Sequence, residues 1–492
     1  MSHTLGESHD ARCPMNHAQL APLARSLRSR LGSENVLSAK SDLVVYECDG
    51  FTIEKNRPEL VVFPRSTRQV AEVVTLANQH DVPIVARGAG TGLAGACLPV
   101  GGGVILMLTR MREIVEINLR DRFAVLEPGV LNLQLARALA GTGYHYAPDP
   151  SSETACTIGG NVGTNAGGPH TLKYGVTVNH VLGLEVVLGD GSIVRQGPVR
   201  EPIGLDLLGL LVGSEGTLGV VTKVWVRLTP DPQDHRTMRA IFDTIDDATG
   251  AVSDVIGAGI VPSAMELMDQ GILEAVEEAF HFGFPLDAGA IVVIELDGPG
   301  AGLDGQQERV VELCRKRRAR EVVPATSVKE RELLWRCRKQ AIGALGRLSP
   351  SYCIQDGVVP RTQLPHILRR IAEIGAKHQL RIVNVAHAGD GNVHPIFLFD
   401  ERDRDQVARV LAAGEELLQE CIACGGSVTA EHGVGVEKLK LMGRLYADAD
   451  LEAMRRVRAA LNPTERLSPG KVLPSPDGPT IERTAPGRRA LP

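Results

Sequence analysis

Two histidines around a glycine turn, and an acidic residue beside a third histidine, are the residues of this chain best suited to chemistry. The turn is His387-Ala-Gly-Asp-Gly-Asn-Val-His394, and the later pair is Glu431-His432. Apolar runs at 382–386 and 395–399 predict a hairpin that brings both imidazoles to the same end of neighbouring strands. Histidines at a turn can also do no more than satisfy backbone groups. Because His387, His394 and Glu431 together form a ligand set for zinc, iron or manganese, we favour a metal site.

Two glycine-rich segments are the next candidates for ligand binding. The first, 87–95, contains Gly90-x-Gly92-x-x-Gly95 after a strand-like run. A dinucleotide fingerprint needs a helix to open there, but Pro99 and glycines 101–103 occupy that place, so we reject this interpretation. The second segment, 159–168, is too rich in glycine for the interior of a helix or strand. The glycines alone could serve tight turns, but two such loops are also suited to clamping one diphosphate.

Size and composition limit the functional classes. A chain of 492 residues predicts two or three domains. A net charge of −6 and 3% aromatic residues argue against nucleic acid as a partner. No run reaches the about 18 apolar residues of a membrane span, and the first residues lack the pattern of a secretory signal. We expect a cytoplasmic protein whose nine cysteines are reduced thiols.

Changes in amino-acid composition and in the pattern of apolar residues divide the chain. Residues 1–38 form a polar extension with one weak helix, and 474–492, rich in Pro, Gly and Arg, predict a disordered tail. Strand-like runs and glycine-rich loops dominate 39–232. From 233 to 473, strand candidates such as 238–242 and 290–296 alternate with helical stretches, which predicts a sheet layered with helices.

The motifs resemble a known flavoprotein superfamily. RGAGTGLAG, YAPDPSS, GGNVGTNAGG and GSEGTLGV are similar to the FAD-binding domain of vanillyl-alcohol oxidases and p-cresol methylhydroxylases (PCMH). MELMD, IELDG, DGVVPR, HAGDGNVHP, EHGVG and NPTERLSPGK extend the likeness, which is strongest to flavin subunits of glycolate oxidases and weaker to D-lactate and D-2-hydroxyglutarate dehydrogenases. The resemblance implies an α+β fold. Residues 39–232 are expected to form a two-subdomain PCMH-type FAD-binding domain. Residues 233–473 are expected to form an α+β substrate (cap) domain with an antiparallel sheet and a C-terminal helical segment. The last part of this domain, about 455–473, is expected to return to the FAD.

The resemblance also implies which residues surround the cofactor. They are Arg87, Gly88, Ala89, Gly90, Thr91, Gly92, Pro148, Asp149, Ser152, Gly159, Gly160, Asn161, Thr164, Asn165, Gly167, Gly168, Glu215, Asn462 and Lys471. Members that bind flavin covalently carry a histidine at the position of Thr91. We therefore expect non-covalent FAD.

The expected reaction is dehydrogenation of a small 2-hydroxy acid, glycolate or D-lactate, to the 2-oxo acid with hydride transfer to flavin N5. It needs a base, a hydride acceptor and an anchor for the carboxylate. The resemblance assigns the base to His432, assisted by a divalent metal, and the anchor to Arg338. A basic run is often only a solvated helix face, and Arg317, Arg318, Arg331 and Arg336 are close in sequence. Ile342 stands where the hydroxyglutarate enzymes place a polar contact, which indicates a short substrate.

Electrons must leave the reduced flavin, and the chain has no cysteine pattern for an iron–sulfur cluster or haem. By analogy we expect iron–sulfur and second flavin-domain-like subunits, or another acceptor, with association to the inner membrane only through such subunits. Oxygen as direct acceptor stays open. Alternatives are a D-lactate or D-2-hydroxyglutarate dehydrogenase, a flavin-free zinc hydrolase built on the metal ligands, and a non-catalytic flavin scaffold subunit.

Overall fold

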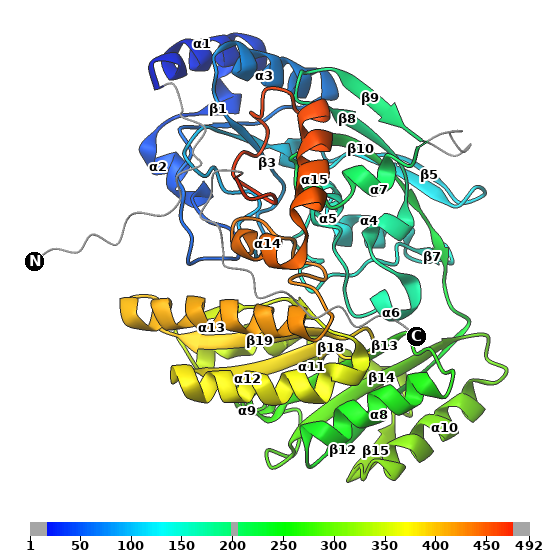
Figure 1. Cartoon of the computed structure of the whole chain (residues 1–492). Helices are drawn as coiled ribbons and strands as arrows, with labels where there is room; N and C mark the ends of the chain where they lie inside the picture. Colours follow the sequence, from blue (N-terminus) through cyan, green and yellow to red (C-terminus); the bar gives the residue numbers. More distant parts are fainter. Residues whose placement is uncertain (1–16, 198–204, 476–492) are drawn as a thin grey trace, which may run out of the picture.

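The computed structural model of the chain describes residues 17–197 and 205–475. Residues 1–16 of the predicted extension and 476–492 of the predicted tail lie outside the described residues. Figure 1 shows two halves, a first half coloured from blue through cyan to blue-green and a second half coloured from green through yellow to orange, with α15 packed back against the first half. Helices and antiparallel sheets are both present, which confirms the α+β class.

The first subdomain is built on a four-stranded sheet in the order β1-β2-β4-β3. Its strands are β1 (Val36–Leu37), β2 (Leu60–Val62), β4 (Val104–Met107) and β3 (Ile84–Arg87), and the last three run parallel. Helices α1 (Leu20–Leu31) and α3 (Thr67–Gln79) share one apolar core with this sheet. Ser66 starts α3 by accepting a hydrogen bond from the backbone of Gln69, and apolar residues at helical spacing then face the sheet.

The second subdomain is a five-stranded antiparallel sheet in the order β5-β6-β10-β8-β9. Its strands are β5 (Ile114–Asn118), β6 (Phe123–Leu126), β10 (Val220–Arg227), β8 (Val181–Val187) and β9 (Ile193–Gln196). The short helices beside it are α4 (Asn132–Leu139), α5 (Ile158–Thr164), α6 (Thr171–Tyr174) and α7 (Leu208–Leu211).

Helix α5 corrects the expectation that 159–168 is too rich in glycine for a helix. Thr157 caps the helix by accepting a hydrogen bond from the Gly160 amide at 3.2 Å. A Cβ at Gly159 would lie 2.5 Å from the Pro128 side chain. The low helix propensity is therefore overridden by the cap and by a close approach to the neighbouring loop that only glycine permits.

The second half is one antiparallel sheet with helices on both faces. Its path is β15 (Glu321–Pro324), β12 (Asp234–Phe242), β14 (Ala290–Gly298), β13 (Ala264–Asp269), β18 (Arg381–His387), β19 (Asn392–Phe399) and β16 (Ser351–Ile354), with β17 (Gly357–Val358) also paired to β19. One face packs on α8 (Ile245–Gly257), α10 (Leu303–Lys316), α12 (Leu364–His378) and α13 (Arg404–Ala423). The other face packs on α9 (Gln270–Phe280) and α11 (Val328–Ala344).

The last described segment crosses back to the first half. After α14 (Met442–Leu445) and α15 (Asp448–Leu461), the chain runs beside β3, where Ile84 pairs with Leu467 as a parallel bridge. The fully buried Asn462 donates to the carbonyl oxygens of Thr217 and Leu467. The C-terminal residues of the second half are thus held by hydrogen bonds to the first.

Helix α1 is part of the first core, because Leu23 and Leu27 are fully buried in it. We expect Leu27→Ala to lower the free energy of unfolding by about 2–5 kcal/mol, since the truncation leaves a cavity between α1 and α3. Urea denaturation followed by circular dichroism would measure this, with the exposed Arg25→Ala on the same helix as the control. Equal stability of both variants would contradict this placement of α1.

Candidate active site

The histidine turn forms the predicted hairpin. Strands β18 and β19 pair so that His387 lies opposite Asn392 and Val385 opposite His394. Both side chains project from the end of the sheet near α11, and their ring centroids are 5.1 Å apart. The prediction that the turn brings the two imidazoles together is confirmed.

Glu431 completes the cluster from the loop after α13. Its Oε1 atom lies 3.2 Å from Nε2 of His387 and 3.1 Å from Nε2 of His394. Candidate ligand atoms of the three residues all lie within 4.8 Å of one another. A Cβ at Gly167, in the first half, would lie 2.8 Å from the Glu431 carboxylate, so a glycine is needed there. Two imidazoles and a carboxylate in this arrangement fit a divalent cation such as Zn²⁺.

Asp356, which the sequence analysis did not single out, organises this loop. It is fully buried, and its Oδ2 atom accepts hydrogen bonds from the amides of residues 430–432 and from the hydroxyl of Thr429, at 2.6–3.1 Å. Burial alone would raise the pKa of Asp356, but His432 and Lys438 hold it well below its usual range. Asp356, His394 and His432 form a second group with metal-ligand spacing that shares His394.

His432 stacks on His394, with parallel rings whose centroids are 5.0 Å apart. Its Nδ1 atom is buried and has no hydrogen-bond partner among the described residues. Burial lowers the pKa of His432 to about 4 against the opposing effect of Asp356, with smaller contributions from His394 and Lys438 that lower it further. A neutral imidazole of this kind can accept a proton.

Arg338 is the arginine that reaches the site. Only 2% of its side chain is exposed, and its Nε atom lies 2.8 Å from Oε2 of the buried Glu266. Its neighbours in sequence are engaged elsewhere: Arg317 with Asp254, Arg318 with Asp247, Arg331 with Glu295, and Arg336 over the ring of Phe282. These four arginines therefore make contacts at the protein surface or at the boundary between the two halves, as expected for a basic run. Arg338 differs from them because it is buried.

One cavity of about 490 Å³ brings these groups to the glycine-rich segments. Arg338, His394, Glu431 and His432 line it, and His387 lies directly behind Glu431. The predicted cofactor residues that line it are Arg87, Gly88, Ala89, Gly90, Thr91, Gly92, Ser152, Gly159, Gly160, Asn161, Thr164 and Glu215. Asp49, Thr157, Lys339 and Tyr352 also line it. These four could not be predicted, because nothing in their local sequence pattern distinguishes them.

The other predicted cofactor residues do not line the cavity. They are Pro148, Asp149, Asn165, Gly167, Gly168, Asn462 and Lys471. Asn165 ends α5 in a left-handed conformation, and Gly168 packs against Asp149. These residues contribute to the shape of the loops and to the packing behind them.

Polar groups without protein partners support a bound cofactor. Nε of Arg87 and Nδ2 of Asn161, both from residues that line the cavity, have no hydrogen-bond partner among the described residues. Nζ of the fully buried Lys471, which lies outside the cavity lining, has none among them either. Burial lowers the pKa of Lys471 to about 7, against the opposing effect of Cys97 and Glu215. Unsatisfied buried polar atoms are costly, so a ligand rich in hydrogen-bonding atoms fits this cavity.

Comparison with known proteins identifies the family. The model described as "FAD linked oxidases, C-terminal domain" matches residues 231–472, and "FAD binding domain" matches residues 58–197. Glycolate oxidase subunit GlcD of Escherichia coli K12 is 42% identical, over 92% of this chain and 90% of that protein. The chain belongs to the FAD-linked oxidases. It is thus an FAD-dependent oxidoreductase, as predicted, and not a flavin-free hydrolase.

Other FAD-linked oxidase relatives agree with this result. GlcD of Bacillus subtilis is 39% identical, over 90% of this chain and 94% of that protein. D-lactate dehydrogenase of Archaeoglobus fulgidus is 32% identical, over 84% of this chain and 91% of that protein. In fold, p-cresol methylhydroxylase has a TM-score of 0.79 at 19% identity, covering 94% of this chain and 98% of that one, which confirms the PCMH-type fold. No helix among residues 17–197 and 205–475 combines the length and hydrophobicity of a membrane span.

Gly90 tests the first glycine-rich segment. It lines the cavity at φ +75°, and a Cβ there would collide with the guanidinium of Arg87. We expect Gly90→Ala to lose bound flavin, measured as absorbance near 450 nm per protein after gel filtration. Gly141→Ala is the matched control, because Gly141 has φ +77° but open space around its Cβ position. Retention of flavin by Gly90→Ala at the level of Gly141→Ala would contradict the assignment.

Proposed function

We propose that this chain dehydrogenates a small 2-hydroxy acid, glycolate or D-lactate, to the corresponding 2-oxo acid. The observation that carries the proposal is the single cavity in which the glycine-rich loops of the first half meet Arg338, His394, Glu431 and His432 of the second. The names of the relatives, glycolate oxidase subunits and D-lactate dehydrogenases, agree with the substrate class.

The chain's own residues would bind and orient the acid. The guanidinium of Arg338 matches a carboxylate in bidentate fashion. A ring nitrogen of His432 accepts the hydroxyl proton. Apolar side chains of Ile342, Ile354 and Val385 also line the cavity and favour a short, uncharged substituent on the substrate.

His387, His394 and Glu431 would hold a divalent cation, Zn²⁺ or else Fe²⁺ or Mn²⁺, and the glycine-rich loops would hold FAD without a covalent bond. When bound, the cation lowers the pKa of a coordinated hydroxyl and FAD accepts the hydride from the substrate carbon. The fit rests on the donor set, on the space kept at Gly167 and on the unpartnered Asn161 amide.

Electrons would then pass to a separate acceptor. Two relatives are named as subunits of glycolate oxidase, which supports partner subunits here. That these include an iron–sulfur subunit and a second flavin-domain-like subunit is proposed by analogy alone. We further propose that the protein is cytoplasmic and reaches the inner membrane only through such subunits.

Steady-state reduction of an artificial dye tests the substrate class. We expect turnover with glycolate and D-lactate, and a much lower kcat/KM with D-2-hydroxyglutarate, because Ile342, Ile354 and Val385 are apolar and Lys339 is already paired with Glu153. A clear preference for D-lactate over glycolate would place the chain with the D-lactate dehydrogenases. Flavin-loaded protein that reduces the dye with none of these acids would refute the proposal.

His432→Ala tests the base. We expect kcat to fall about 10²- to 10⁴-fold with flavin content unchanged, because proton removal loses its acceptor. The exposed His366→Ala on α12 is the control for removal of an imidazole outside the cavity. Unchanged turnover by the complete enzyme carrying His432→Ala would favour the scaffold alternative.

A further inference from the structure

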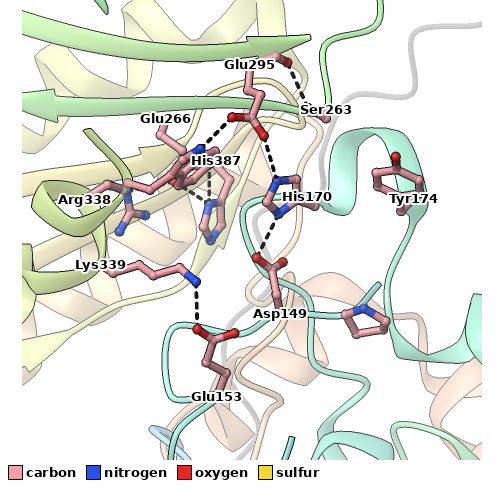
Figure 2. A network of polar contacts seen from close by, with 12 residues as sticks. Asp149, Glu153, His170, Tyr174, Ser263, Glu266, Glu295, Arg338, Lys339 and His387 are labelled. Atoms are coloured by element: carbon pink, nitrogen blue, oxygen red, sulfur yellow. Dashed lines mark hydrogen bonds and ion pairs between the residues drawn. The ribbon is translucent and has the colours of Figure 1, made fainter. Parts of the chain in front are cut away.

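The fully buried carboxylate of Glu266 touches both functional parts of the cap domain. Its two oxygens lie 2.8 and 2.9 Å from Nδ1 of His387, and Oε2 lies 2.8 Å from Nε of Arg338. Figure 2 shows the three side chains meeting on one face of the sheet. The contact follows from strand register, because Glu266 of β13 lies directly opposite His387 of β18.

Glu266 is fully buried, and an apolar cluster begins beside its polar partners. Met268, two residues along the same strand, packs in the cluster between the sheet and helices α9 and α11. A buried carboxylate is stable in such a place only when it is paired and hydrogen-bonded. Replacing a buried ion pair by apolar residues of similar volume is often neutral or stabilising, so the two partners of Glu266 are the reason to look for a functional role.

We propose that Glu266 is a positioning residue that fixes the His387 imidazole for the cation and the Arg338 guanidinium for the substrate carboxylate. The inference rests on the proposed function and adds a residue to it. By accepting the Nδ1 hydrogen, Glu266 selects the tautomer in which Nε2 of His387 carries a free lone pair facing Glu431. Carboxylate partners of this kind orient metal-binding histidines and increase their basicity.

The recorded ion-pair contact between this carboxylate and Arg338 runs through Nε, at the base of the guanidinium, and not through its far end. The two terminal nitrogens, Nη1 and Nη2, can then face a carboxylate in the cavity. One side chain thereby fixes the relative position of the cation and the substrate anchor, which must contact the same short acid.

Zn²⁺ binding to the full-length protein, stripped of metal and loaded with FAD, tests the proposal. We expect Glu266→Gln to weaken Zn²⁺ affinity about 10- to 100-fold in competition with a chromophoric chelator. Flavin absorbance per protein should stay at the wild-type value. At saturating Zn²⁺, kcat for glycolate should recover while KM stays raised, because Arg338 remains misplaced.

Glu266→Gln leaves Arg338 without its buried counter-ion, and an unpaired buried charge lowers the stability of the fold. A second pair of variants therefore separates this loss of stability from the loss of His387 positioning. Arg338→Met alone should keep wild-type Zn²⁺ affinity, and Glu266→Gln with Arg338→Met should show the 10- to 100-fold weakening. Glu185→Gln is the matched control, since it removes a buried carboxylate that is also paired, with Arg195 and Lys223, but that lies on β8 of the first half and touches no candidate ligand.

Equal Zn²⁺ affinity in the wild type and both Glu266 variants would overturn the inference and reduce Glu266 to a counter-ion of Arg338, with the proposed function intact. A wild-type protein that binds no Zn²⁺ would instead remove the metal from the proposed function, and the inference with it.

Discussion

Buried charge at the boundary between the two halves is the constraint on which the active cavity depends. His170, from the first half, lies with Nδ1 2.8 Å from Asp149 and Nε2 3.7 Å from Glu295 of the cap domain (Figure 2). Burial would lower the pKa of His170, but Asp149 and Glu295 raise it to about 10, so the ring is a cation between two carboxylates. Because unpaired buried charges are costly, these contacts favour the alignment of the halves that closes the cavity.

The contacts of His170 and Glu295 also extend to helix α11, which carries Arg338. The Nε1 atom of Trp335 donates to Glu295 at 2.7 Å, and its ring lies against that of His170, with centroids 5.1 Å apart. Arg338 follows Trp335 after about one helical turn and so lies on the same face of α11. Contacts that hold the two halves together thereby also orient the helix that carries Arg338. Further along the boundary, Lys173 and Tyr174 bind Asp297, the second acidic residue of β14.

Local patterns were enough to predict much of the fold. Apolar runs at 238–242 and 290–296 predicted β12 and β14, and the runs at 382–386 and 395–399 predicted β18 and β19. The hairpin carrying His387 and His394 was predictable because both strands and the turn lie within one short segment. The motifs of the family allowed many cavity residues to be named without any knowledge of how the chain folds back, although Asn462 and Lys471, which they also named, lie outside the cavity lining.

What the sequence could not predict depends on contacts between distant segments. Glu266 and His387 are 121 positions apart, and Asp356 organises a loop more than seventy positions downstream. Strand order and register create both contacts, and neither leaves a periodic signal in the sequence. Helix α5 was missed for a related reason, because its glycines are explained by packing on Pro128 and by the Thr157 cap, not by helix propensity.

The two halves contribute different kinds of groups to the cavity, and this difference has a chemical consequence. The first half lines it mainly with glycines and small residues, whose backbone groups suit a cofactor of fixed shape. The cap domain supplies the imidazoles, the carboxylate, Arg338 and the apolar wall with Ile342. A substitution in that wall can change which acid fits while the cofactor loops and the buried ion pairs stay as they are. Substrate preference within this family can therefore diverge through a few cap-domain side chains, whereas the boundary network must be preserved for any substrate to react.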